Sequence, residues 1–198
     1  LKRKKMIEIY FDGSCGPSNP DGDMGVGVVV KENGQIIDSY SAKITRKDFG
    51  KTTTNNVAEY CAFLKALELA GKHNKKCTIM GDSKLVIDQM RGFWKIKFGA
   101  YSELAHEAKE IYESMLDIVH RIKWIPREEN TEADALSTGN QIKRVEGTNE
   151  YTDYEWRPLR DITTYELAVC MGYLMNKKPI SIYDIQSRKT IFRHFFFK

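Results

Sequence analysis

Hydrophobic and polar positions follow two rhythms along the chain, and these rhythms predict its strands and helices. Short apolar runs bounded by turn residues indicate strands at 6–11, 26–30, 35–43, 75–81 and 118–125. Apolar residues spaced three or four positions apart indicate helices at 55–70 and 101–116, with further helices beginning at Asp82 and Thr131. The elements therefore begin with a strand and a hairpin and continue as alternating helices and strands.

This order predicts an α/β fold whose sheet has mixed strand directions. Because a β–α–β crossover joins parallel strands, we expect the first, fourth and fifth strands to run in the same direction. Asp12 and Asp82 then fall at the carboxyl ends of parallel strands. Open α/β sheets usually place their functional sites at that edge.

Composition narrows the class of protein. The chain has 198 residues, 41% hydrophobic and 29% charged, which is typical of a soluble globular domain with an appendage. The sequence contains no apolar run of about 18 residues and does not open on an apolar signal segment, so we expect a cytoplasmic protein without a membrane span. Its four cysteines are scattered without a CxxC pair, which argues against a zinc site or a disulfide framework.

The net charge of +4 permits a polyanionic partner without requiring one. Four of the first five residues are basic. We interpret residues 1–5 as a solvated basic tail, with Met6 as a candidate natural start; a phosphate-binding arm is the alternative.

Four acidic residues stand where one predicted element gives way to the next: Asp12, Glu59, Asp82 and Asp134. Each has an ordinary structural explanation when taken alone. Asp12 precedes a glycine and suits a turn, and Asp82 suits a helix N-cap. Glu59 and Asp134 each lie three residues after a capping residue, which is the spacing of a capping box.

Taken together, the four acids favour a metal site. Capping does not account for Asp12, which leads into no predicted helix. Four carboxylates at one edge of a sheet would repel one another unless a divalent cation bound between them. Hard cations such as Mg²⁺ prefer oxygen ligands, and a pair of such ions can clamp a phosphodiester undergoing hydrolysis.

Five strings of residues carry a resemblance to a known family. They read YFDGSC at 10–15, TTNNVAEY at 53–60, GDSKLVIDQM at 81–90, FWKIK at 93–97 and PREENTEADALS at 126–137. In their order and spacing, residues 6–138 resemble type 1 ribonuclease H, especially its short bacterial and archaeal forms. The resemblance implies a ribonuclease H-like five-stranded mixed sheet flanked by helices.

The resemblance also implies an endoribonuclease, a hydrolase that cleaves the RNA strand of RNA/DNA hybrids and leaves 5′-phosphate and 3′-hydroxyl ends. Two Mg²⁺ ions, or Mn²⁺ as a substitute, would serve as cofactors. By similarity, Asp12 would bridge both ions and Asp134 would help to hold the ion that activates water. Glu59 and Asp82 would help to hold the ion at the leaving oxygen.

Further residues match the family's substrate contacts. By that resemblance, Asn55 and Asn56, with Asn19 and Cys15, would read the minor groove of the hybrid. Thr54 and Asn130 would grip a phosphate of the DNA strand, and an aromatic–basic patch would lie along its backbone: Trp94, Lys95 and Lys97. Helix capping remains the alternative for Asn55 and Asn56, as does packing for Trp94.

Two features depart from the family pattern. The loop at 125–130 has no histidine, whereas many members carry one before the last acid, and Arg127 is a candidate source of charge there. The segment at 92–99 is brief and lacks the long basic protrusion of some bacterial members.

The predicted domains are a catalytic domain at 6–139 and a small, mostly helical C-terminal extension at 140–198. Apolar and aromatic residues near the end of the chain suggest that residues 160–198 fold onto the core or bind a protein partner or a second copy. A second nucleic-acid-binding element, which their mixture of basic and aromatic residues would suit, is the alternative. Two other functions stay open: a non-catalytic hybrid-binding or assembly module, and the ribonuclease H part of a reverse-transcribing polyprotein.

Overall fold

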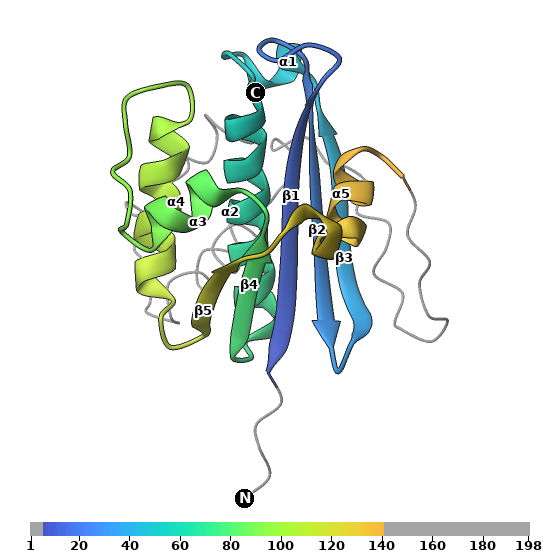
Figure 1. Ribbon diagram of the computed structural model, residues 1–198, viewed down its shortest axis with the longest axis vertical. Coiled ribbons are helices and arrows are strands. Elements are labelled where there is room, and N and C mark those ends of the chain that lie inside the picture. Colours follow the sequence, from blue (N-terminus) through green and yellow to red (C-terminus); the bar gives the residue numbers. More distant parts are fainter. Residues whose placement is uncertain (1–5, 141–198) are drawn as a thin grey trace, which may run out of the picture.

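A computed structural model of the protein describes residues 6–140, which form a five-stranded sheet with the order β3-β2-β1-β4-β5 (Figure 1). The strands are β1 (Ile7–Gly16), β2 (Asp23–Glu32), β3 (Gln35–Ile44), β4 (Cys77–Gly81) and β5 (Val119–Trp124). The first three are antiparallel neighbours, whereas β1, β4 and β5 run parallel to one another. The predicted mixed sheet and its three parallel strands are therefore confirmed.

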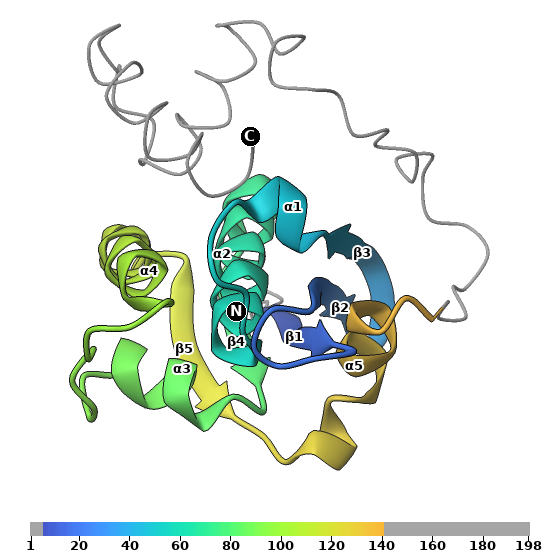
Figure 2. The same cartoon turned by 90° about the horizontal axis from the view of Figure 1, so that it is seen from above.

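The helices lie on both faces of this sheet (Figure 2). They are α1 (Arg46–Phe49), α2 (Asn55–His73), α3 (Lys84–Met90), α4 (Ser102–Ser114), the 3₁₀ turn η1 (Arg127–Glu129) and α5 (Thr131–Ser137). The long helix α2 packs on β1 and β2 and also contacts α3 and α4, while α5 packs against the first three strands. Among the described residues, no helix is long and apolar enough to cross a membrane.

The core lies between the sheet and α2. Ile7, Ile9 and Phe11 alternate along β1 and have no exposed surface, as expected for one face of a strand. The Phe11 ring meets Phe63 of α2 edge to face, with centroids 5.3 Å apart. This contact fixes α2 across the strand that carries Asp12.

Helix α5 packs on the opposite face, and a glycine makes its approach possible. A Cβ atom on Gly27 of β2 would overlap the backbone of Ala133 and Ser137 in α5. Gly27 pairs with Asp12 across the sheet, so Asp12 and α5 share one face. The chain thereby brings Ser137 next to a strand that lies 125 residues earlier.

Three local predictions differ from the structure. Strand β1 continues to Gly16 because it pairs with β2 as far as Asp23, so Asp12 lies within a strand and not in a turn. The helix expected to begin at Asp82 begins at Lys84. The short elements α1 and η1 were not predicted, since four and three residues are too few to show a period. The predictions for residues 1–5 and 141–198, including the extension and its partners, lie outside the described residues.

Candidate active site

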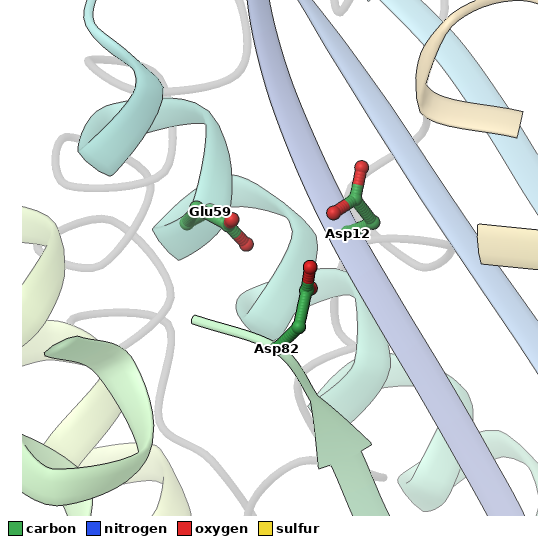
Figure 3. Close-up of side chains that lie close together, drawn as sticks. All are labelled: Asp12, Glu59 and Asp82. Atoms are coloured by element: carbon green, nitrogen blue, oxygen red, sulfur yellow. The ribbon is translucent and has the colours of Figure 1, made fainter. Parts of the chain in front are cut away.

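Three acidic side chains converge beside the middle of β1, where β4 ends (Figure 3). Asp12 comes from β1, Glu59 from the first turns of α2, and Asp82 from the residue after β4. Each offers a carboxylate oxygen, and these oxygens all lie within 4.8 Å of one another. Asp12 and Glu59 are buried, at 5% and 6% exposed, so the cluster has little water around it to screen its charge.

The parallel pairing of β1 and β4 explains why Asp12 and Asp82 meet. Phe11 pairs with Gly81, and the two acids are the next residues on their strands. Asn130 then links the middle of β1 to the residue that follows β4. Its side-chain amide donates to the Phe11 carbonyl and to Asp82 Oδ1, both at 2.9 Å.

Glu59 reaches the cluster because α2 crosses β1 closely. A Cβ atom on Gly13 would overlap the backbone of Ala58 and Glu59, so only glycine allows this approach. The Gly13 N–H donates to the Glu59 carboxylate. Glu59 Oε2 is buried without a partner among the described residues. A buried, unpaired carboxylate oxygen aimed at two other acids is the kind of atom that a cation would satisfy.

The surroundings oppose ionisation of two members of the cluster, Asp12 and Glu59. Burial, followed by the charges of Asp82 and Asp134, raises the pKa of Asp12 from 3.8 to about 7, against the opposing hydrogen bond from Ser137. Burial also raises the pKa of Glu59 well above its usual value, helped by Asp12 and Asp82. A bound cation would favour the ionised forms of Asp12 and Glu59 and so oppose this effect of burial.

Asp134 is held apart from these three carboxylates. It lies on α5, and Arg127 Nη2 contacts its Oδ1 at 2.5 Å. The negative charge of Asp134 nevertheless raises the pKa of Asp12, and Arg127 lowers it, so both charges lie near Asp12. The structure thus brings together three of the four predicted acids and pairs the fourth with the arginine of the 125–130 loop.

The structure contradicts the capping alternatives for these acids. Thr54 caps α2 by accepting from the Val57 N–H, so Glu59 closes no capping box with Asn56. Ser83 stands at the N-cap of α3, which leaves Asp82 free of that position. Asn130, not Thr131, precedes the first turn of α5 and makes no side-chain cap.

The predicted groove-reading residues form one connected surface beside the cluster. Asn55 Oδ1 accepts from the Cys15 N–H at 3.1 Å, and Asn19 Oδ1 accepts from the Asn55 N–H at 3.2 Å. Asn19, Asn55 and Asn56 are exposed. The loop after β1 and the start of α2 are therefore fixed to each other, with their amide groups at the surface.

Other predicted contacts occupy different surroundings. Trp94, Lys95 and Lys97 are exposed on the loop between α3 and α4. Asn130 has no exposed surface, and its amide is engaged by the main chain and Asp82. In this conformation Asn130 holds Asp82 through a hydrogen bond and presents no atom at the surface for a phosphate.

Two residues that hold the acids in place were not predicted from the sequence. Ser137 Oγ donates to Asp12 Oδ2, and the Trp124 indole N–H donates to the Asp82 carbonyl at 2.9 Å. Ser137 closes the recognised PREENTEADALS string, but nothing in the string indicates which acid it contacts. Both roles depend on packing between distant elements.

Comparisons with known proteins show which family this chain is similar to. A family model described as reverse transcriptase-like matches residues 10–139. The bifunctional protein Rv2228c of Mycobacterium tuberculosis is 30% identical over 134 residues, covering 66% of this chain and 35% of that protein. Ribonuclease HI of Halobacterium salinarum is 34% identical over 133 residues, covering 66% of this chain and 62% of that protein. The chain thus spans only 35% to 62% of the length of these two curated relatives.

A solved structure carries the comparison over a whole domain. The crystal structure of LC11-RNase H1 in complex with an RNA/DNA hybrid is 32% identical, with a TM-score of 0.56, and covers 68% of this chain and 95% of that one. The family model alone matches more than half of this chain. We conclude that the protein belongs to the reverse transcriptase-like family, among its type 1 ribonucleases H.

Proposed function

We propose that the protein is a metal-dependent endoribonuclease that hydrolyses the RNA strand of RNA/DNA hybrids and leaves 5′-phosphate and 3′-hydroxyl ends. The observation that carries this proposal is the convergence of Asp12, Glu59 and Asp82, whose oxygens lie within 4.8 Å of one another. The named relatives support the choice of reaction, because a solved relative is a ribonuclease H1 bound to a hybrid.

The donor set suits Mg²⁺, with Mn²⁺ as a substitute. All three converging ligands are carboxylates, which hard divalent cations prefer, and Glu59 Oε2 has no competing partner among the described residues. When bound, two such ions would stabilise the charge on the attacking and leaving oxygens of the phosphodiester. Asp134, whose charge already raises the pKa of Asp12, would complete the ligand set once its ion pair with Arg127 breaks.

The protein's own contribution is preorganisation of these carboxylates. Gly13, Ser137 and Asn130 each donate a hydrogen bond to one of them, namely Glu59, Asp12 and Asp82. Because these bonds exist before substrate arrives, these three carboxylates do not have to reorganise during the reaction. Arg127 supplies a positive charge that lowers the pKa of both Asp12 and Glu59.

Substrate selection would rest on the surface next to the cluster. A hybrid carries 2′-hydroxyls on one strand only, and an amide can both donate to a hydroxyl and accept from it. Asn19, Asn55 and Asn56 present such amides at the surface beside the acids. Trp94 and Lys95 would meet the DNA strand, where backbone contacts make binding sensitive to salt.

Strand-specific cleavage tests the proposal. The purified protein is incubated with a labelled RNA/DNA hybrid, a duplex RNA and a duplex DNA, with and without Mg²⁺. We expect metal-dependent cleavage of the RNA in the hybrid, and loss of that cleavage in Glu59→Gln while hybrid binding survives. Glu68→Gln is the matched control, since it makes the same change on the same helix at a glutamate paired with Lys65.

Two outcomes would contradict the assignment. Robust cleavage by pure Glu59→Gln would show that the carboxylate cluster does not carry the reaction. Binding of hybrids without turnover in Mg²⁺ or Mn²⁺ would favour the non-catalytic binding module instead.

A further inference from the structure

The loop at 91–100, between α3 and α4, presents an unusual surface. Phe93 is 67% exposed and Phe98 is fully exposed, and basic side chains alternate with them. The Arg91 guanidinium stacks over Phe93, and the Lys84 ammonium lies 5.9 Å from the centroid of the Trp94 ring. Apart from Ile96, which is partly buried against the core, the side chains of this loop gain little from burial, so specific hydrogen bonds help to fix its position.

A buried glutamine beneath the loop provides such hydrogen bonds. Gln89 lies near the end of α3 and is only 2% exposed. Its Nε2 donates to the Lys95 carbonyl at 3.0 Å, in the middle of the loop, and to Tyr101 Oη at 3.4 Å, where the loop ends. The main chain of α3 holds only the beginning of the loop, where Phe93 and Trp94 donate to the Asp88 carbonyl.

The same amide is tied to the helix that carries Glu59. Tyr60, the next residue of α2, donates its hydroxyl to Gln89 Oε1 at 2.5 Å. The Tyr60 ring also stacks on Tyr101, with centroids 5.6 Å apart and planes 7° from parallel. Gln89 thus connects the catalytic helix to the middle and to the end of the exposed loop.

From this arrangement we infer that Gln89 is a positioning residue, which holds the 91–100 loop at a fixed place relative to the acidic cluster. Because Gln89 fixes the loop, Trp94 and Lys95 contact the nucleic acid at a set distance from the carboxylates that act on its RNA strand. This inference rests on the proposed function and concerns the fit of the substrate, not the chemical step.

An amide is the side chain that this position requires. Tyr60 needs an acceptor, while the Lys95 carbonyl and Tyr101 Oη each need a donor, and a neutral amide offers one acceptor oxygen and two N–H donors. Substitution by an apolar side chain of similar length would leave the buried Tyr60 hydroxyl and two part-buried acceptors, the Lys95 carbonyl and Tyr101 Oη, without their partner, and the loop would relax toward water to satisfy them.

The test compares Gln89→Met with Ile79→Val. Methionine keeps the length of the side chain but removes all three hydrogen bonds. Ile79 is a fully buried residue of β4 that none of these bonds involves, so its variant controls for a general loss of stability. Both are studied in the full chain against the unaltered protein.

Limited proteolysis gives a readout that does not depend on activity. Trypsin cleaves after Arg91, Lys95 and Lys97, and the products are assigned by mass. We expect Gln89→Met to be cut at these sites about tenfold faster, because local opening of the loop exposes its backbone. Ile79→Val should keep the rate of the unaltered protein there.

Binding and kinetics test the effect on substrate. In chelator, we expect the Kd of Gln89→Met for a labelled hybrid to rise about five- to tenfold, the loss expected for one hydrogen-bonded contact region. With metal, KM should rise by a similar factor while kcat stays within about twofold, since the reacting groups are untouched. Tyr60→Phe, which removes only the donor to Oε1, should change Kd and KM in the same direction but less.

Unchanged Kd and KM in folded Gln89→Met would overturn the inference, as would equal effects in Ile79→Val. Should Gln89→Met not fold, Gln89→Glu serves in its place, because it keeps an oxygen for Tyr60 and lacks the amide group that donates to Lys95. If the unaltered protein neither binds nor cleaves a hybrid, the proposed function fails instead, and the tryptic rates still decide whether Gln89 holds the loop.

Discussion

Glu107 should make the stability of this protein depend on pH in a way that a single substitution removes. It lies on α4 with its Oε2 buried and without a partner among the described residues. Burial, followed by the charge of Glu110, raises its pKa from 4.5 to about 7. We therefore expect Glu107→Gln to stabilise the fold at alkaline pH.

The sign follows from proton binding. A carboxyl whose pKa is higher in the folded state stabilises the fold while it is protonated, so this contribution is complete below pH 4.5 and is lost as the pH rises through about 7. For a fully buried group the loss would be about 3 kcal/mol. Because Glu107 is only half-buried, water screens part of this electrostatic penalty. We therefore expect the free energy of unfolding of Glu107→Gln to exceed that of the unaltered protein by about 1–2 kcal/mol at about pH 8.

Urea unfolding at about pH 4.5 and about pH 8 checks this expectation. The quantity compared is the difference in free energy of unfolding between Glu107→Gln and the unaltered protein. The raised pKa values of Asp12 and Glu59 affect both proteins alike and cancel in that difference. Glu110→Gln is the matched control, since Glu110 is exposed on the same helix, and its gain should be less than half as large. A Glu107→Gln variant with no gain at about pH 8, or with the same gain at both pH values, would refute the reasoning.

Three further predictions concern the acidic cluster. Gly13→Ala should lower the free energy of unfolding by about 3 kcal/mol or more, because the added Cβ would overlap the backbone of α2. It should also weaken Mg²⁺ binding measured by calorimetry. Gly16→Ala is the control and should be nearly neutral, since its Cβ meets nothing within 4 Å. Ser137→Ala removes a hydrogen bond that lowers the pKa of Asp12, so the acidic limb of the pH–rate profile should move to higher pH; an unmoved limb would contradict this. Addition of Mg²⁺ at neutral pH should raise the melting temperature of the unaltered protein in proportion to the logarithm of its concentration, and the rise should be smaller in Asp12→Asn.

Much of the fold could be predicted from the sequence because it depends on local periodicity. The strand at 35–43 and the helix from Asn55 were located to within a few residues, since alternating and 3.6-residue patterns are written into neighbouring positions. The parallel direction of β1, β4 and β5 followed from the crossover rule. The candidate acids were likewise visible, because each stands in a short polar string near a predicted element boundary.

Only the tertiary structure decided how those acids are used. Whether Asp134 joins the cluster or pairs with Arg127 depends on side-chain orientation, which no pattern of residue types encodes. The burial of Asn130 and the bond from Ser137 to Asp12 arise where α5 packs across the sheet, over a separation of 125 residues for the latter pair. Periodicity specifies which face of an element is apolar, whereas contacts between distant elements depend on how those faces fit together in space.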